Sequence, residues 1–180
     1  MRYPKFRLTI GVGAALILAG PSAHGDFSGP YAPANWTLTN SNNGDGSATN
    51  DGATLVLTSA DNNPGMMNNT DYTVASAAAG VFSFHWLYST QDSCVFDLPY
   101  YLVNGTATPM MPGGCSPGLN GDVAVSVNAG DIIGFRMHSV DSQLGPGWIT
   151  VTNFHGPIPG PAGAALLLLP RAVGPARRRS

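Results

Sequence analysis

The feature that most constrains the fold is an alternation of apolar and polar side chains with a period of two residues. It is strongest in the segment 81–88, where every second position is aromatic: Phe82, Phe84, Trp86 and Tyr88. Successive side chains of a β-strand point to opposite faces of its sheet, so these four rings share one face. We therefore predict a central strand whose aromatic face belongs to the core.

The same period recurs in two later segments. Apolar side chains take alternate positions at Val123, Val125 and Val127, and again at Ile133, Phe135 and Met137. In the second of these segments Arg136 and His138 fall on the opposite, polar side. Residues 127–131 read Val-Asn-Ala-Gly-Asp, which is typical of a tight turn, so we predict that the two strands form a hairpin.

Eight strand-length segments with turn residues between them are predicted in this way. They are 35–39, 53–59, 71–75, 81–89, 99–104, 122–128, 132–139 and 148–154. The polar run 40–52 is rich in Asn-Gly and Asp-Gly turn signals and is predicted as a loop. We expect an all-β fold, an antiparallel β-sandwich or jelly roll of about eight strands, with short apolar, helical tails at both ends.

Charged residues are segregated along the chain, and this limits the partners. Seven of the eight basic residues lie near the two ends, whereas all ten acidic residues are aspartates of the middle. Between residues 26 and 156 one arginine, Arg136, stands against ten aspartates, which gives this region a formal charge of −9. Such a surface repels nucleic acid and anionic lipid. We therefore expect no nucleic-acid partner, while neutral glycans and divalent cations stay open.

The first 25 residues have the pattern of a secretory signal peptide. Three basic residues precede an apolar run of twelve residues, 8–19. Small residues at Ala23 and Gly25 predict cleavage between Gly25 and Asp26. The apolar run is shorter than the ~20 residues that a membrane-spanning helix needs. We therefore predict export through the secretion machinery rather than a permanent anchor.

The C-terminal residues 157–180 contain three parts in order. A proline-rich spacer, 157–161, is followed by an apolar run, 162–169, and the chain ends in a basic cluster, Arg177, Arg178 and Arg179. An apolar segment followed by arginines can hold an exported chain in the membrane with the arginines on the cytoplasmic side. We therefore expect transient membrane association through this tail.

This tail resembles the PEP-CTERM family of sorting signals, which have a Pro-Glu-Pro motif, an apolar helix and an arginine-rich end. Pro159, Gly160 and Pro161 occupy the motif, with glycine where the family has glutamate. The resemblance implies recognition by an exosortase and cleavage near the motif. It also implies release or attachment at the surface of Gram-negative bacteria that make exopolysaccharide.

The middle of the chain is also similar to a recurrent domain of PEP-CTERM proteins. The matching segments are 27–31, 35–37, 43–47, 101–105, 127–131, 134–136 and 150–154. The resemblance implies a fold and a location, and it implies no reaction. We therefore divide the chain into a signal peptide (1–25), a β-sandwich domain (26–156) and a PEP-CTERM-like sorting tail (157–180).

The chain has two cysteines, Cys94 and Cys115, in predicted loops on either side of the strand 99–104. On the oxidising side of a membrane we expect them to form a disulfide. Closing a loop of this length adds about 3 kcal/mol of stability through the entropy of the unfolded chain. Two unbonded thiols are the alternative.

Sequence motifs for catalysis are scarce. There is no His-Glu-x-x-His zinc motif and no phosphate-binding loop with its lysine, and residues 26–156 contain no lysine for a Schiff base. Ten aspartates make carboxylate pairs inevitable by chance, so a pair alone would not indicate a glycosidase. We therefore predict a protein that is not an enzyme, with a hydrolase as a distant alternative.

Metal and cofactor sites are weakly indicated. His85 and His138 both fall on the polar side of their strands and would meet if those strands were neighbours, but a zinc site needs at least three protein ligands. The loop 43–47 superficially resembles a calcium loop, yet Thr54 stands where the twelfth, acidic ligand belongs. We predict no metal site and no cofactor; calcium held by clustered aspartates is the alternative.

Three aromatic residues are candidates for a glycan-binding surface, because sandwich domains grip sugars with exposed rings beside Asp and Asn. They are Trp36, Trp148 and Tyr100. The leading hypothesis is a non-catalytic, exported cell-surface or extracellular matrix protein associated with exopolysaccharide. A carbohydrate- or calcium-binding module is the alternative.

Overall fold

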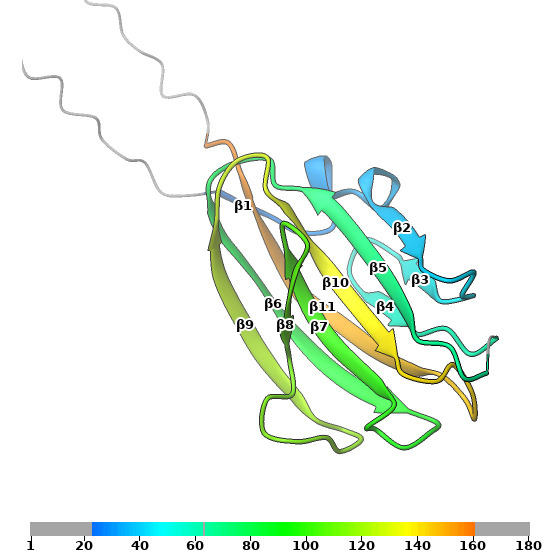
Figure 1. Cartoon of the computed structure of the whole chain (residues 1–180). Helices are drawn as coiled ribbons and strands as arrows, with labels where there is room; N and C mark the ends of the chain where they lie inside the picture. The colour runs from blue at the N-terminus through cyan, green and yellow to red at the C-terminus, as the bar shows by residue number, and fades with distance from the viewer. Residues whose placement is uncertain (1–22, 63, 161–180) are drawn as a thin grey trace, which may run out of the picture.

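A computed structural model of the chain describes residues 23–62 and 64–160 and shows two antiparallel sheets packed face to face (Figure 1). The first sheet has the order β3-β4-β11-β6-β9, with β1 beside β11, and the second has the order β2-β5-β10-β7-β8. The chain is therefore an all-β antiparallel sandwich, as its alternating pattern predicts.

The strands of the first sheet are β1 (Ala23–Gly25), β3 (Ser47–Asn50), β4 (Leu55–Thr58), β6 (Gly80–Thr90), β9 (Asn120–Val127) and β11 (Gly147–Ile158). Those of the second sheet are β2 (Thr37–Asn40), β5 (Asn68–Ala75), β7 (Asp97–Val103), β8 (Thr106–Pro109) and β10 (Ile132–Ser139). Two short 3-10 turns, Gly29–Tyr31 and Pro33–Asn35, precede β2.

The described residues form eleven strands rather than about eight, because the sequence did not indicate β1, β3 and β8. The prediction of a loop over 40–52 is wrong at β3, which reads Ser-Ala-Thr-Asn and pairs with β4 along the edge of its sheet. β8 reads Thr-Ala-Thr-Pro and pairs with β7 at the edge of the other sheet. Neither strand has the apolar alternation by which strands are found in a sequence.

The core between the sheets is built by the predicted alternation. Phe82 and Tyr88 of β6 are fully buried, and Phe84 and Trp86 are nearly so. Phe135 of β10 faces them from the second sheet, and its ring centroid lies 4.8 Å from that of Phe84 in an edge-on contact. Aromatic pairs in this geometry add to the stabilisation that comes from burial alone. The aromatic stripe of β6 is thus the centre of the core, as predicted.

The turn 127–131 does not make a hairpin, and that prediction is wrong. β9 pairs with β6 in the first sheet, whereas β10 pairs with β5 and β7 in the second. The turn itself is present, since the backbone N–H of Asn128 donates to Asp131 Oδ2 at 2.6 Å. The segment therefore carries the chain from one sheet to the other.

A buried carboxylate joins the two sheets. Asp97, at the start of β7, is 2% exposed, and its Oδ1 accepts a hydrogen bond from the hydroxyl of Ser59 at 2.7 Å. Thr90 of β6 donates to Oδ2 at 3.2 Å. Burial raises the pKa of Asp97, and the hydrogen bonds oppose this shift. Ser59 and Asp97 are both buried, whereas Thr90 is partly exposed.

Cys94 and Cys115 form a disulfide, as predicted, with their Cα atoms 5.6 Å apart. The bond ties the loop between β6 and β7 to the loop between β8 and β9. It closes a large loop of the chain at one end of the sandwich.

The two described ends of the chain lie side by side, because Ala23 of β1 pairs with Ile158 of β11 (Figure 1). The sandwich thus includes residues on both sides of the expected boundaries at 26 and 156. The predicted cleavage site follows the last residue of β1.

In the C-terminal tail, Pro159 and Gly160 are exposed beyond the end of β11. Pro161, the cluster 177–179 and both expected helical tails lie outside the described residues. No described segment forms a helix long and apolar enough to span a membrane.

Candidate functional site

The outer face of the second sheet gathers polar and aromatic side chains from three neighbouring strands. Arg136 of β10 has Asp71 of β5 on one side and Tyr100 of β7 on the other. Two residues further along β10, His138 lies beside Asn69 of β5. We call these five residues the Tyr100 face. They face outward because Phe135 and Met137, which alternate with Arg136 and His138, are fully buried in the core.

Arg136 and Asp71 form a two-pronged ion pair at the centre of the Tyr100 face. Nε of Arg136 donates to Oδ1 of Asp71 at 2.6 Å, and Nη2 donates to Oδ2 at 2.7 Å. The side chains are only 23% and 19% exposed. The hydrogen bonds to Asp71 raise the pKa of Arg136. A guanidinium has five N–H donors, so this pairing leaves others for a ligand.

His138 and Tyr100 complete the arrangement. Nδ1 of His138 lies 2.8 Å from Oδ1 of Asn69, and its ring meets that of Tyr100 edge-on, with 6.4 Å between centroids. Burial, and then the charge of Arg136, lowers the pKa of His138. The ring is therefore neutral at neutral pH. Because an amide oxygen only accepts, Nδ1 carries the proton and Nε2 is left as an acceptor.

A hollow of about 290 Å³ lies over these side chains and is lined by Asn69, Tyr100, Ala107, Arg136 and His138. Ala107, on the edge strand β8, supplies a small apolar wall. The site offers a phenol ring, N–H donors and an imidazole acceptor. All of them stand on paired strands, which hold side chains more rigidly than loops do.

The three predicted glycan-binding residues lie in three different places. Trp36 is 8% exposed, stacks on Tyr72 at 4.8 Å and donates from its indole N–H to the carbonyl of Tyr31. Trp36 therefore belongs to the core, and its assignment to a binding surface is wrong. Tyr100 lies at the hollow just described. Trp148 lies on the outer face of the first sheet.

Trp148 has few polar partners of the kind found around Tyr100. Its neighbours across the strands are Thr58 of β4 and Ser89 of β6. In the next row Thr150 lies between Val56 and Leu87. We call Trp148, Thr150, Thr58, Ser89 and Leu87 the Trp148 face. These five side chains include no charged group.

His85 and His138 do not meet, as they would have done only on neighbouring strands. β6 and β10 belong to different sheets, so the two imidazoles lie on opposite outer faces of the sandwich. His85 instead pairs with Asp122 of β9, with 2.9 Å between Nδ1 and Oδ1. Among residues 23–62 and 64–160, no three or more His, Cys or Asp side chains are grouped so as to hold a metal ion.

One motif with a catalytic meaning elsewhere was missed in reading the sequence. Residues 114–118 read Gly-Cys-Ser-Pro-Gly, which has the spacing of the Gly-x-Ser-x-Gly nucleophile motif. That motif requires a sharp turn from a strand into a helix, whereas these residues form a loop between β8 and β9. The hydroxyl of Ser116 donates to the carbonyl of Pro117 at 3.4 Å, and Cys115 is bonded to Cys94. Ser116 therefore does not stand on the strand-to-helix turn that a nucleophilic serine of this motif requires.

No protein-family model matches the chain, and no curated protein matches it in sequence. Among solved structures, it is similar to a family 35 carbohydrate binding module from Clostridium thermocellum, with 16% identity and a TM-score of 0.37 over 73% of this chain and 98% of that one. It is also similar to a family 29 carbohydrate binding module from Piromyces equi, with 13% identity and a TM-score of 0.38 over 77% and 87%. At these values the likeness concerns the architecture and assigns no activity.

Proposed function

We propose that the protein is a non-catalytic carbohydrate-binding module that takes a glycan on the Tyr100 face. The observation that carries the proposal is the convergence of Tyr100, Arg136 and His138 on one hollow of about 290 Å³. Binding sites for small polar molecules combine an apolar wall with a few well-placed polar groups. The hollow over the Tyr100 face has this composition.

A sugar ring matches these groups in two ways. Its C–H surface can pack on a half-buried aromatic ring such as that of Tyr100. Its neighbouring hydroxyls both donate and accept, so they can accept from Arg136 and donate to Nε2 of His138. The ion pair with Asp71 fixes the guanidinium plane before a ligand arrives, which lowers the entropic cost of binding.

The electrostatics of the face favour an uncharged glycan. Arg136 is the one basic residue between residues 26 and 156, and Asp71 neutralises it. The −9 formal charge of this region, one arginine against ten aspartates, repels anions over the whole surface. We infer that neutral polysaccharides bind better than acidic ones.

A titration of the full chain against soluble polysaccharides tests this function. Affinity gel electrophoresis with a β-glucan, a galactomannan and the anionic polysaccharide alginate would measure retardation by each. We expect at least one neutral polysaccharide to retard the chain and Tyr100→Ala to weaken that binding about tenfold, since a stacked ring is worth on the order of 1 kcal/mol or more.

Trp148→Ala is the matched control, because it removes a half-buried aromatic ring from the opposite outer face. We expect it to leave the retardation within about twofold of the unchanged chain, a difference well under 1 kcal/mol. Equal losses in both variants, or losses only in Trp148→Ala, would show that the Tyr100 face is not the binding site. No retardation by any polysaccharide would contradict a carbohydrate-binding function.

We also propose that the module acts outside the cytoplasm, at the cell surface or in an exopolysaccharide matrix. The disulfide supports this location, because such bonds persist in oxidising compartments. Expression of the full chain in a Gram-negative host, followed by N-terminal sequencing of the exported product, provides the test. We expect the sequence to begin at Asp26; an uncut chain confined to the cytoplasm would contradict export and processing by exosortase alike.

A further inference from the structure

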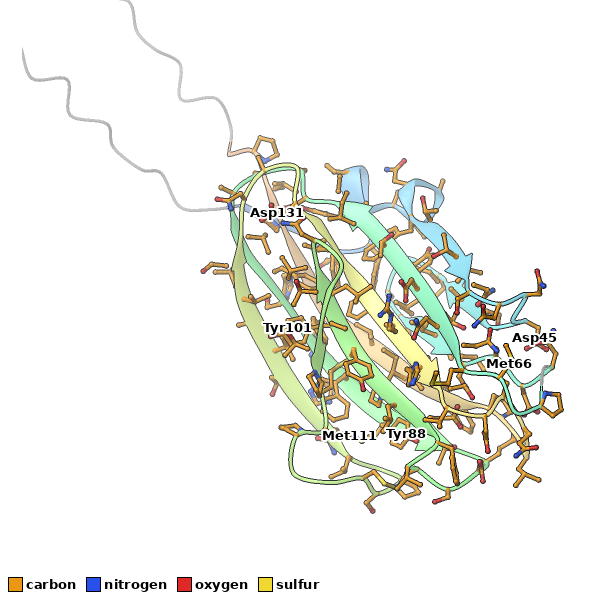
Figure 2. The ribbon with its side chains drawn as sticks, in the orientation of Figure 1. Asp45, Met66, Tyr88, Tyr101, Met111 and Asp131 are labelled. Atoms are coloured by element: carbon orange, nitrogen blue, oxygen red, sulfur yellow. A yellow bond between two sulfur atoms is a disulfide. The ribbon has the colours of Figure 1, made fainter. Side chains whose placement is uncertain are left out.

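A second hollow is separate from the Tyr100 face. It has a volume of about 410 Å³ and lies between the inner side of β6, at Trp86, and the loop that joins β8 to β9. Besides Trp86 it is lined by Met110, Met111, Leu119, Asn120 and the loop residues 112–116. Figure 2 shows Met111 near one end of the sandwich, whereas Asp131 lies at the other. We call this space the Trp86 hollow.

The lining of the Trp86 hollow is mostly apolar and carries no charge, and its polar side chains besides the indole are Ser116 and Asn120. Met110, Met111 and Leu119 supply aliphatic and thioether groups, and no ionisable side chain lines the hollow, because Cys115 is held in a disulfide. The hollow over the Tyr100 face, by contrast, is lined by His138 and Arg136. A charged ligand would therefore lose part of its hydration in the Trp86 hollow without meeting an opposite charge.

The indole of Trp86 supplies one directed polar group. The side chain is 5% exposed, and its N–H donates to no acceptor within the described part of the chain, but the indole nitrogen itself is not fully buried, so a ligand can reach it. Trp36, by contrast, donates from its indole to the carbonyl of Tyr31 at 2.9 Å. Gly121, opposite Trp86 on β9, leaves this edge of the ring uncovered: a Cβ there would lie 3.2 Å from the indole nitrogen. An indole N–H in such surroundings favours a ligand that brings an acceptor.

A covalent tether holds the wall of the hollow in place. The loop between β8 and β9 contains Gly113, Gly114 and Gly118, so its backbone has much conformational freedom. Its ends are fixed by hydrogen bonds from Met110 N to Pro99 O and from Gly118 N to Tyr88 O. Between these ends the Cys94–Cys115 disulfide is the covalent link to the neighbouring loop.

We propose that the Trp86 hollow is a second binding site, for a small uncharged aromatic molecule that carries a hydrogen-bond acceptor, and that the disulfide keeps the site in shape. The volume falls in the range of about 300–1,000 Å³ that small-molecule sites occupy. Thioethers make favourable contacts with aromatic rings, which suits Met110 and Met111 to such a ligand. A phenol or aryl ether oxygen would accept from the Trp86 indole.

Nuclear magnetic resonance of the full chain labelled with nitrogen-15 tests the site directly. The three tryptophans give three indole N–H signals, which Trp36→Phe, Trp86→Phe and Trp148→Phe assign. With p-cresol as the probe, we expect the Trp86 signal to shift in a saturable way while the signals of Trp36 and Trp148 stay in place. The absence of a Trp86 shift up to solubility, or an equal shift of Trp148, would overturn the proposal.

Matched variants and probes sharpen the test. Met111→Asp puts a charge into the hollow and should weaken p-cresol binding about tenfold or more, whereas Met67→Asp, at a 60% exposed position on another loop, should leave it unchanged. If Met111→Asp fails to fold, Leu119→Asp serves, since Leu119 is already 37% exposed. 4-Hydroxybenzoate, which adds a carboxylate to the same ring, should produce no Trp86 shift.

The role of the tether is measured in the same way. The double variant Cys94→Ser, Cys115→Ser should keep the folded spectrum and weaken p-cresol binding. Unchanged binding would overturn the structural role given to the disulfide.

Tyr100→Ala should leave p-cresol binding unchanged, because Tyr100 does not line the Trp86 hollow. A failure of the Trp86 site is therefore distinguishable from a failure of glycan binding on the Tyr100 face.

Discussion

The two outer faces of the sandwich are made by the same kind of strand yet offer different chemistry. On the second sheet, Tyr100 stands beside a charged pair, an imidazole and an amide, and a hollow lies over them. On the first sheet, Trp148 stands among threonine, serine and leucine side chains. Under the proposed function, the contrast implies that an outward aromatic ring alone does not make a binding site. The proposal gives this role to polar groups that converge on the ring from neighbouring strands.

The largest expected difference between the faces is in stability. Arg136→Ala leaves the carboxylate of Asp71, only 19% exposed, without its partner, so we expect a loss of about 2–3 kcal/mol in the free energy of unfolding. Thr150→Ala, in the middle of the Trp148 face, should cost about 0.5 kcal/mol or less. Urea unfolding of both variants measures the difference.

A double substitution separates two contributions to the stability loss in Arg136→Ala: the charge of Asp71 left without a partner, and the packing lost with the arginine side chain. Arg136→Gln combined with Asp71→Asn removes both charges and keeps side chains that can hydrogen-bond. This double variant should recover about half or more of the stability lost in Arg136→Ala. Equal losses from Arg136→Ala and Thr150→Ala would mean that the ion pair of the Tyr100 face contributes no more than an ordinary surface contact.

An intermediate effect is expected from Asp97, which lies between the two faces. Because burial raises its pKa, the folded chain holds the Asp97 proton at a higher pH than the unfolded chain does. This group therefore contributes stability below about pH 3.8, and the contribution falls as the pH rises through the raised pKa. Asp97→Asn should remove that part of the pH dependence.

Urea unfolding midpoints between pH 3.5 and about pH 7 would measure the Asp97 contribution. Asp45→Asn is the control, since Asp45 is exposed in the loop between β2 and β3. The unfolding curve for Asp97→Asn should differ from that of the unchanged chain most at the acid end, and more than the curve for Asp45→Asn does. Parallel curves for all three chains would contradict an effect of burial on Asp97.

The smallest expected effect is a pH dependence that comes from His138 of the Tyr100 face and is not expected from His85 on the opposite outer face. Burial and Arg136 lower the pKa of His138, so the folded chain binds this proton less readily than the unfolded chain. Stability from His138 is thus present above the ordinary pKa of 6.5 and is lost as the pH falls through the lowered value. Protonation also removes the acceptor at Nε2, so glycan affinity should fall over the same range.

His138→Gln should flatten this acid loss of glycan affinity, whereas His85→Gln, on the opposite outer face, should leave it unchanged. Affinity electrophoresis at several pH values between 4.5 and 7.5 provides the measurement, read for each chain relative to its own affinity at the highest pH. An acid loss that persists in His138→Gln would assign it to another group.

Parts of the candidate site could be predicted, and parts could not. The alternation around Phe135 placed Arg136 and His138 on a polar side, and the structure confirms this. Tyr100 was a candidate for glycan binding and lies at the hollow, but Trp36 was an equal candidate and is in the core. Nothing in the sequence linked Asn69 and Asp71 to the site, because contacts across strands bring together residues far apart in the chain.

The sequence by itself determined the local structure: strands of period two and an aromatic core centred on β6. Only the tertiary structure decided which strands are neighbours. It sent β9 and β10 to different sheets, put His85 and His138 on opposite faces, and assembled both the Tyr100 face and the Trp86 hollow. The physical reason is that alternation fixes the side of a strand on which a residue lies, whereas strand pairing depends on long-range packing that no short segment encodes.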